Sequence, residues 1–206
     1  MGECRLYLVT DARSAAGDLD RFLAEVLDAG VGMVQLREKQ MEAGPLLRYA
    51  EVVRRRTAAA GALFIVNDRV DVAIAAGADG VHLGQQDLPL DEARRQVGPE
   101  LIVGVSTHSV DQLESATAST ADYCAIGPVF ATPTKPGRPA VGLDLVRAAA
   151  KRATKPVFAI GGINASNVRS VLDAGAGRVS VVRALTQSDD PAGEARKLTA
   201  ALGQLD

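Results

Sequence analysis

The sequence has no tryptophan, and only 3% of its residues are aromatic. Proteins that bind single-stranded nucleic acid stack the bases on aromatic side chains, so this shortage argues against that function. A formal net charge of −2 likewise argues against a broad basic surface for nucleic acid. The cluster Arg54 to Arg56 follows a helix-like stretch, and we interpret it as the solvated end of that helix. Small-molecule chemistry is the favoured class.

Long apolar runs are missing as well. None reaches the roughly 18 residues needed to cross a bilayer, and the first residues show neither a secretory signal nor a myristoylation pattern. Cys4 and Cys124 are too few for a disulfide framework and adjoin strand-like residues, so we expect buried free thiols. These features predict a cytoplasmic protein without a membrane partner. They leave open whether identical chains form an oligomer.

What the chain does contain is a regular alternation of short β-like runs with helix-like stretches. The runs cover residues 5–9, 32–36, 63–66, 80–83, 101–105, 123–126, 156–160 and 178–182. Alternation of this kind is typical of βα units around a parallel sheet. With no linker or low-complexity tract, it predicts one α/β domain over residues 1–206, a compact (β/α)8 TIM barrel. The alternative is an open doubly wound sheet, although no GxGxxG motif opens its first turn.

A weak internal repeat supports this count of strands. Segments 28–36, 75–83 and 173–181 each read as a helix end, a glycine, a small residue and a strand. We predict that the glycines Gly30, Gly77 and Gly175 adopt left-handed backbone conformations and close the preceding helices.

The active site of such a barrel forms at the carboxyl ends of the strands, so the residues after each β-like run are the candidates. The second run ends in QLREK, which places Gln35, Arg37 and Lys39 at alternate positions, on one face of an extended strand. Two cations and an amide suit a polyanion such as a diphosphate, which Arg can bind bidentately. The alternative is a solvated strand end with Glu38 as counterion.

Carboxylates follow the third and fourth runs. Asn67 and Asp68 occur in VNDR, and Asp87 ends HLGQQD. A helix N-cap is the alternative role for these residues. Two carboxylates at adjacent strand ends, beside basic residues, suggest Mg²⁺, which takes one or two carboxylates and completes its shell with water and phosphate. We interpret His82, within the fourth run, as a core or pocket-wall residue rather than a metal ligand.

Smaller polar residues follow the remaining runs. Ser106 can donate to a phosphate or a ring nitrogen, while Ser109 is a candidate helix cap. His108 is either an acid/base group or part of that turn. The sixth loop, VFATPTKPG, supplies two threonines and Lys135, and GG at 161–162 permits close backbone approach to a phosphate. The sequence therefore predicts two anion-binding ends of one cleft.

At these positions the chain resembles the thiamine-phosphate synthase family. Six of its motifs occur in the family's order and cover essentially the whole chain: QLREK (35–39), NDRVDVA (67–73), DGVHLGQQD (79–87), GVSTH (104–108), IGPVFATPTK (126–135) and GGI (161–163). The resemblance implies a TIM barrel that joins a hydroxymethylpyrimidine diphosphate to a thiazole phosphate. The products would be thiamine phosphate and pyrophosphate, with carbon dioxide when the thiazole carries a carboxylate.

The resemblance also implies a role for each matching residue. The pyrimidine diphosphate would be held by Gln35, Leu36, Arg37, Glu38, Lys39, Asn67, Ser106 and Lys135. The thiazole phosphate would be held by Thr132, Pro133, Thr134, Gly162, Val182 and Arg183. Mg²⁺ would bind Asp68 and Asp87, and the departing diphosphate would be stabilised by Arg37, Lys39 and Lys135.

One position departs from the family pattern, which usually has Ser where this chain has Arg183. We expect Arg183 to add a cationic contact to the thiazole phosphate, since Arg matches phosphate geometry well. The alternative is that its side chain turns outward.

Two further functions remain as alternatives. A related barrel, a thiazole tautomerase, isomerises the carboxythiazole phosphate without forming a C–N bond, but it would not need the diphosphate and metal residues. A non-catalytic sensor of phosphorylated ligands needs affinity without transition-state stabilisation. For a sensor we would expect the metal carboxylates to be lost.

Overall fold

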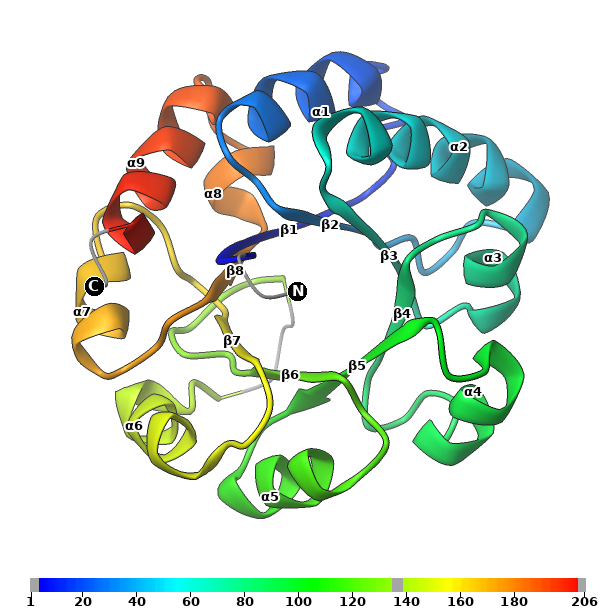
Figure 1. Ribbon diagram of the computed structural model, residues 1–206. Helices are drawn as coiled ribbons and strands as arrows, with labels where there is room; N and C mark the ends of the chain where they lie inside the picture. Colours follow the sequence, from blue (N-terminus) through cyan, green and yellow to red (C-terminus); the bar gives the residue numbers. More distant parts are fainter. Residues whose placement is uncertain (1–3, 135–138, 204–206) are drawn as a thin grey trace.

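The structure is a computed structural model that describes residues 4–134 and 139–203. Its parallel strands form a closed barrel in chain order, and helices surround the barrel (Figure 1). The strands are β1 (Leu6–Thr10), β2 (Met33–Leu36), β3 (Leu63–Asn67), β4 (Gly80–Leu83), β5 (Ile102–Thr107), β6 (Tyr123–Ile126), β7 (Val157–Ile160) and β8 (Val179–Val181). Because β8 pairs with β1, the predicted TIM barrel is confirmed and the open sheet is wrong.

A helix follows each strand, and a further helix ends the described chain. The helices are α1 (Leu19–Asp28), α2 (Ala43–Ala60), α3 (Val70–Ala75), α4 (Leu90–Val97), α5 (Val110–Ala118), α6 (Gly142–Arg152), α7 (Val168–Asp173), α8 (Arg183–Thr186) and α9 (Pro191–Gly203). No helix in the described ranges is long and apolar enough to span a membrane.

The strands bury both faces, in two separate apolar layers. The outer layer fills the space between the strands and the helices; in α1, for example, Leu19, Phe22, Leu23 and Val26 recur at helical spacing on the buried side. The inner layer fills the barrel itself with Tyr7, Val9, Met33, Ile65, Tyr123 and Phe158. This double burial explains why the strand sequences are nearly continuous in apolar residues.

The repeated glycines behave as predicted. Gly30, Gly77 and Gly175 have φ values of 99°, 59° and 99°, and each follows a helix that leads into the next strand. Left-handed geometry ends the helix at that point and sets the direction of the chain. The internal repeat therefore marks the start of β2, β4 and β8.

The interpretation of Arg54 to Arg56 as a helix end is wrong. Helix α2 continues to Ala60, and its last turn has no basic residue. Arg54 pairs with Asp79 at 2.9 Å, and Arg55 and Arg56 both pair with Asp20 on α1. The carboxylates of Asp79 and Asp20, rather than the helix dipole, are the partners of this cationic cluster.

Cys4 and Cys124 are free thiols, with Cys124 buried and Cys4 partly exposed.

Candidate active site

A cavity of about 510 Å³ opens at the carboxyl ends of the strands. Ten of the residues predicted for the site line it: Gln35, Arg37, Asn67, Ser106, Thr132, Pro133, Thr134, Gly162, Val182 and Arg183. They come from six different strand ends and loops, which the closed barrel brings to one place. The structure therefore assembles most of the predicted contacts around one space.

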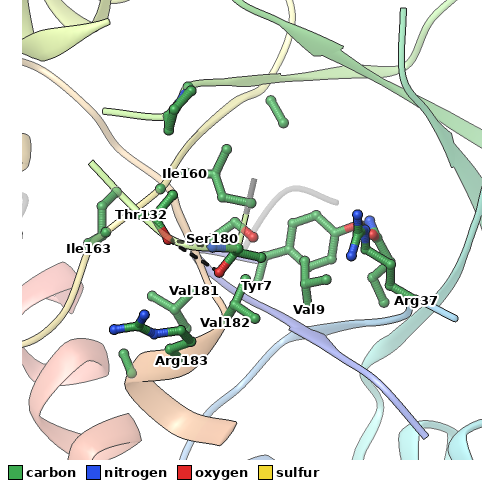
Figure 2. Close-up of a pocket in the computed structure, with 18 of the residues that line it drawn as sticks. Tyr7, Val9, Arg37, Thr132, Ile160, Ile163, Ser180, Val181, Val182 and Arg183 are labelled. Atoms are coloured by element: carbon green, nitrogen blue, oxygen red, sulfur yellow. Dashed lines mark hydrogen bonds between the residues drawn. The ribbon is translucent and has the colours of Figure 1, made fainter. Parts of the chain in front are cut away.

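Arg37 and Arg183 mark two sides of this cavity. Arg37 follows β2 and Arg183 follows β8, and β1 lies between these strands in the barrel. Figure 2 shows the two guanidinium groups apart, with Tyr7 and Val9 of β1 between them. Two separate cationic positions in one cavity suit a pair of anionic ligands.

The remaining residues of QLREK have different environments. Strand β2 ends at Leu36, so the predicted alternation past that point does not come from an extended strand. The Leu36 side chain packs in the outer apolar layer, which leaves only its main chain for a ligand contact. Glu38 accepts a hydrogen bond from the Ala12 N–H at 2.7 Å and forms no ion pair within the described residues, so it is not the counterion of the alternative interpretation.

Lys39 belongs to a charged group beside the cavity. Its ammonium lies 3.2 Å from the Asp68 carboxylate, and the carboxyls of Asp68 and Asp87 lie next to each other. Burial first, and then the neighbouring Asp87, raise the pKa of Asp68 above its ordinary value. Burial opposes the ionisation of Asp87 too, but hydrogen bonds from Asp68 and the Gly84 amide outweigh it and lower that pKa.

Neither carboxylate caps a helix, so the capping alternative is wrong. Helix α3 begins after Arg69 and α4 after Pro89, and no side chain caps either N-terminus. Asp87 instead accepts the Gly84 N–H at 2.7 Å, within its own loop. Asp68 has a φ of 59°, in the left-handed region that non-glycine residues seldom adopt and that often marks functional positions.

Two carboxylates in contact form a donor set that fits Mg²⁺. Among the described residues no group of three or more His, Cys, Asp or Glu side chains could hold a metal ion. Magnesium does not need three, because it typically binds one or two carboxylates and takes its other ligands from water and phosphate. A divalent cation between two such carboxylates would offset their mutual repulsion.

The opposite end of the cavity is built from the loop after β7 and the turn into α8. Gly162 has a φ of 67°, and a Cβ there would lie 2.8 Å from the Cβ of Phe130. Glycine is therefore required for both backbone conformation and space. Arg183 is the first residue of α8, an exposed residue that lines the cavity, and its contact with the thiazole phosphate stays a prediction.

The loop after β6 reaches the same cavity. The Thr132 hydroxyl donates to the Thr134 hydroxyl at 3.2 Å and accepts the Thr134 N–H at 3.3 Å, and Pro133 between them also lines the cavity. Lys135, predicted to contact the diphosphate, lies outside the described residues. Its role stays a prediction.

His82 and Ser109 have the roles predicted for them, while His108 has features of both of its alternatives. His82 is buried in the cavity wall and hydrogen-bonds Tyr123 and Ser106, each at 2.9 Å. Ser109 caps α5 by accepting the Gln112 N–H. His108 lines the cavity, and its Nδ1 lies 2.5 Å from the Gly127 carbonyl oxygen, an acceptor that requires a proton on Nδ1.

Four polar residues of the cavity were missed in the sequence: Tyr7, Asn164, Ser180 and Gln187. Tyr7 and Ser180 are paired across β1 and β8 and point into the barrel. Strand alternation through Val9 and Val182 could have identified these inward positions. Ser180 Oγ and Asn67 Nδ2 are buried polar atoms with no hydrogen-bond partner in the described ranges, and Asn67 Nδ2 is a donor available to a ligand.

A family model described as thiamine monophosphate synthase matches residues 6–185. The chain belongs to this family. Relatives named thiamine-phosphate synthase include one from Acidothermus cellulolyticus, 52% identical over 204 residues, which cover 98% of this chain and 96% of the relative. Another, from Mycobacterium tuberculosis, is 50% identical over 213 residues, with the same coverage.

A solved structure supports the same assignment. Thiamine phosphate pyrophosphorylase from Pyrococcus furiosus superposes with a TM-score of 0.89 at 33% identity, covering 98% of this chain and 96% of that chain. Membership of the thiamine monophosphate synthase family thus confirms the resemblance found in the six motifs. The roles of individual residues remain predictions.

Proposed function

We propose that the protein is a transferase of thiamine biosynthesis that joins a hydroxymethylpyrimidine diphosphate to a thiazole phosphate or its carboxylated form. One observation carries the proposal: a single cavity has two separate cationic positions, Arg37 and Arg183, on either side of β1. Each substrate brings one anionic group, and both must lie in the same space for their carbon and nitrogen atoms to react.

The diphosphate end would lie beside β2 to β4. Arg37 and Lys39 provide cations there, and Asn67 offers an unpaired amide donor into the cavity. A guanidinium binds phosphate oxygens through two parallel hydrogen bonds, which fixes orientation as well as charge. Lys135 would add a further cation from the loop after β6.

Magnesium would complete this end. Asp68 and Asp87 would hold the ion, because they are adjacent carboxylates next to the proposed diphosphate position. When bound, Mg²⁺ supplies positive charge that stabilises the departing diphosphate. Lys39, already paired with Asp68, would then be free to turn toward the phosphate oxygens.

The phosphate end would lie between the loop after β7 and the turn into α8. Gly162 brings main chain close to the ligand there, and Thr132 and Thr134 provide hydroxyl groups from the neighbouring loop. The Arg183 guanidinium would neutralise the phosphate. This end would hold the thiazole with its ring nitrogen toward the pyrimidine methylene carbon.

The chemistry follows from this arrangement. Departure of pyrophosphate leaves a pyrimidine-methylene cation, which the thiazole nitrogen captures, so one C–O bond breaks and one C–N bond forms. With the carboxylated thiazole a C–C bond also breaks, and carbon dioxide leaves. Such a dissociative step needs the leaving-group charge neutralised and the acceptor held close, rather than a protein nucleophile. The free thiols fit this scheme, since neither Cys4 nor Cys124 lines the cavity. A cytoplasmic location also fits this scheme. So does a set of partners limited to small molecules, without nucleic acid or membrane.

The direct test is to incubate the purified protein with both phosphorylated substrates and Mg²⁺ and to measure thiamine phosphate and pyrophosphate. We expect both products in equal amounts and no reaction after chelation of Mg²⁺. Lys135→Ala should depress coupling far more than thermal stability. A protein that forms no thiamine phosphate under these conditions is not the proposed synthase.

A thiazole tautomerase is the second candidate, favoured by one observation: His108, an acid/base group, lines the cavity. Its Nδ1 proton is held by the Gly127 carbonyl oxygen, which leaves Nε2 as the basic nitrogen. Isomerisation of the carboxythiazole phosphate without metal, with no coupling, would support the tautomerase and reject the synthase.

A further inference from the structure

A chain of hydrogen bonds runs through the inside of the barrel, below the cavity. The Gln35 amide Nε2 donates to the Tyr7 hydroxyl, which lies 3.0 Å from the Tyr123 hydroxyl. Tyr123 lies 2.9 Å from His82 Nδ1, and His82 Nε2 lies 2.9 Å from Ser106 Oγ. Both ends of the chain, Gln35 and Ser106, line the cavity.

The direction of this chain follows from the orientation of the Gln35 amide, whose nitrogen faces Tyr7, together with a count of donors. Tyr7 accepts from Gln35, so its own proton must go to Tyr123, its one other hydrogen-bond partner among the described residues. Tyr123 must then donate to His82 Nδ1, because an unused donor in a buried site is costly. His82 therefore carries its proton on Nε2 and donates it to Ser106.

The two ends consequently face the cavity with opposite character. Ser106 Oγ accepts from His82, so its own proton is available to a ligand. The Gln35 amide uses its nitrogen toward Tyr7, so its carbonyl oxygen is the group left for the cavity. The cavity floor offers one hydroxyl donor and one amide acceptor.

The inner apolar layer holds this chain rigidly. Tyr7, Tyr123 and Phe158 pack edge to face, with ring centroids 5.2 to 6.0 Å apart. Position 104 on β5 has no side chain, and a Cβ there would overlap the Tyr123 ring. Burial raises the pKa values of both Tyr7 and Tyr123 above their ordinary range, so both phenols keep the protons that the chain requires.

We propose that Tyr7, Tyr123 and His82 are positioning residues that set the direction of this chain and so select a 4-aminopyrimidine over its 4-oxo counterpart. This inference rests on the proposed function. A 4-aminopyrimidine has a ring nitrogen that accepts from Ser106 and an exocyclic amine that donates to Gln35. The 4-oxo ring has a carbonyl oxygen in place of the amine and an N–H beside it. It fits only the reversed chain, with the Gln35 amide turned over and the His82 proton on Nδ1.

The tautomer of His82 can be measured directly on the unmodified protein. The chain has two histidines, and the structure assigns them opposite tautomers, with the proton of His82 on Nε2 and that of His108 on Nδ1. Long-range ¹⁵N–¹H correlation spectra of imidazole-labelled protein distinguish the two patterns. We expect one of each; His82 protonated on Nδ1 would overturn the proposed direction.

Selectivity is tested by the KM values of the 4-amino and 4-oxo pyrimidine diphosphates. Tyr123→Phe should raise the KM of the 4-amino substrate about tenfold and leave the KM of the thiazole phosphate unchanged. The KM values of the 4-amino and 4-oxo substrates should therefore differ less than in the unmodified protein. Tyr49→Phe is the matched control, since Tyr49 lies on α2, away from the cavity. If Tyr123→Phe folds poorly, Tyr7→Phe takes its place, and the same changes in KM are expected.

The outcomes separate this inference from the proposed function. Coupling activity with identical KM values in Tyr123→Phe and Tyr49→Phe would reject the positioning role and retain the synthase. Equal KM values for the amino and oxo substrates in the unmodified protein would also reject it. Failure of the unmodified protein to form thiamine phosphate would reject the synthase, while the tautomer measurement would still test the chain.

Discussion

The Lys39 ammonium lies 3.2 Å from the Asp68 carboxylate, and the Asp87 carboxyl lies next to Asp68. One cation therefore faces two carboxylates before any ligand binds. Burial and then the neighbouring Asp87 raise the pKa of Asp68, so its ionised form is unfavourable in the folded protein. A cation beside these two carboxylates would offset their repulsion, in keeping with the proposed Mg²⁺ site.

Asp68→Asn should change stability and activity in opposite directions. Because burial raises the folded pKa of Asp68 above its unfolded value of 3.8, ionisation of Asp68 lowers the free energy of unfolding as pH rises through these two pKa values. Removing the charge should raise the free energy of unfolding in EDTA slightly, by less than about 1 kcal/mol because the site is partly exposed. Coupling in Mg²⁺ should fall at least about 100-fold, through loss of a metal ligand and its charge-assisted contacts.

Thermal unfolding in EDTA and a coupling assay measure the two effects. Asp144→Asn is the control, since that exposed carboxylate pairs only with Arg147 on α6 within the described chain. Unchanged coupling in Asp68→Asn would remove Asp68 from the metal site.

Asp20 gives a prediction for acid unfolding. Hydrogen bonds from Arg56 and then Arg55 lower the pKa of Asp20 to about 2. A carboxylate with a lowered folded pKa stabilises the protein above its unfolded value of 3.8, and this contribution is lost as pH falls toward 2. Asp20→Asn should therefore lower the melting temperature near neutral pH, and the difference from the unmodified protein should vanish at about pH 2.

Thermal unfolding across this pH range measures that difference. The effect should shrink in high salt, because exposed ion pairs are screened. A melting-temperature difference that stays constant down to the lowest pH would show that Asp20 acts through packing of α1 against α2 rather than through its charge.

The barrel could be predicted because both faces of each strand are buried, which makes the strands continuous apolar runs such as LFIV in β3. The site residues could be predicted because parallel strands place their ends together. For this reason Arg37 and Ser106, far apart in the chain, line one cavity.

What could not be predicted depends on contacts distant in sequence. Nothing local distinguishes Tyr7 from an ordinary core tyrosine, because its partners Gln35 and Tyr123 lie on other strands. The capping interpretation of Asp68 failed for the same reason. Helix N-caps and metal ligands use the same residue types at the same strand-to-helix turns, and only the position of Asp87 separates the two roles.

Gly162→Ala tests the phosphate end, with Gly61→Ala as a matched control. Both glycines have left-handed conformations, with φ values of 67° and 64°. A Cβ at 162 would lie 2.8 Å from Phe130, whereas nothing lies within 4 Å at 61. Gly61→Ala should cost about 1 kcal/mol from backbone strain alone, and Gly162→Ala should cost about 1 to 3 kcal/mol more.

Activity should separate the two glycine variants further. Gly162→Ala should raise the KM of the thiazole phosphate with little change in that of the pyrimidine diphosphate, while Gly61→Ala should keep both. The two glycines have the same type of backbone conformation, so equal kinetics in the two variants would show that close main-chain approach at 162 does not serve the ligand.

Arg183→Ser, which restores the residue usual in the family, tests the departure of this chain from that pattern. Arg183 lines the cavity at the start of α8, so the variant removes a cation from the proposed phosphate position without disturbing the core. Charge-assisted hydrogen bonds contribute about 1.5 to 3 kcal/mol, which predicts a rise in the KM of the thiazole phosphate of about 10- to 100-fold. The KM of the pyrimidine diphosphate should not change.

Arg169→Ser is the control, because Arg169 on α7 is exposed and pairs with Asp173. Equal KM values for the thiazole phosphate in the two variants would show that neighbouring groups, such as the Gly162 main chain, bind the phosphate without Arg183.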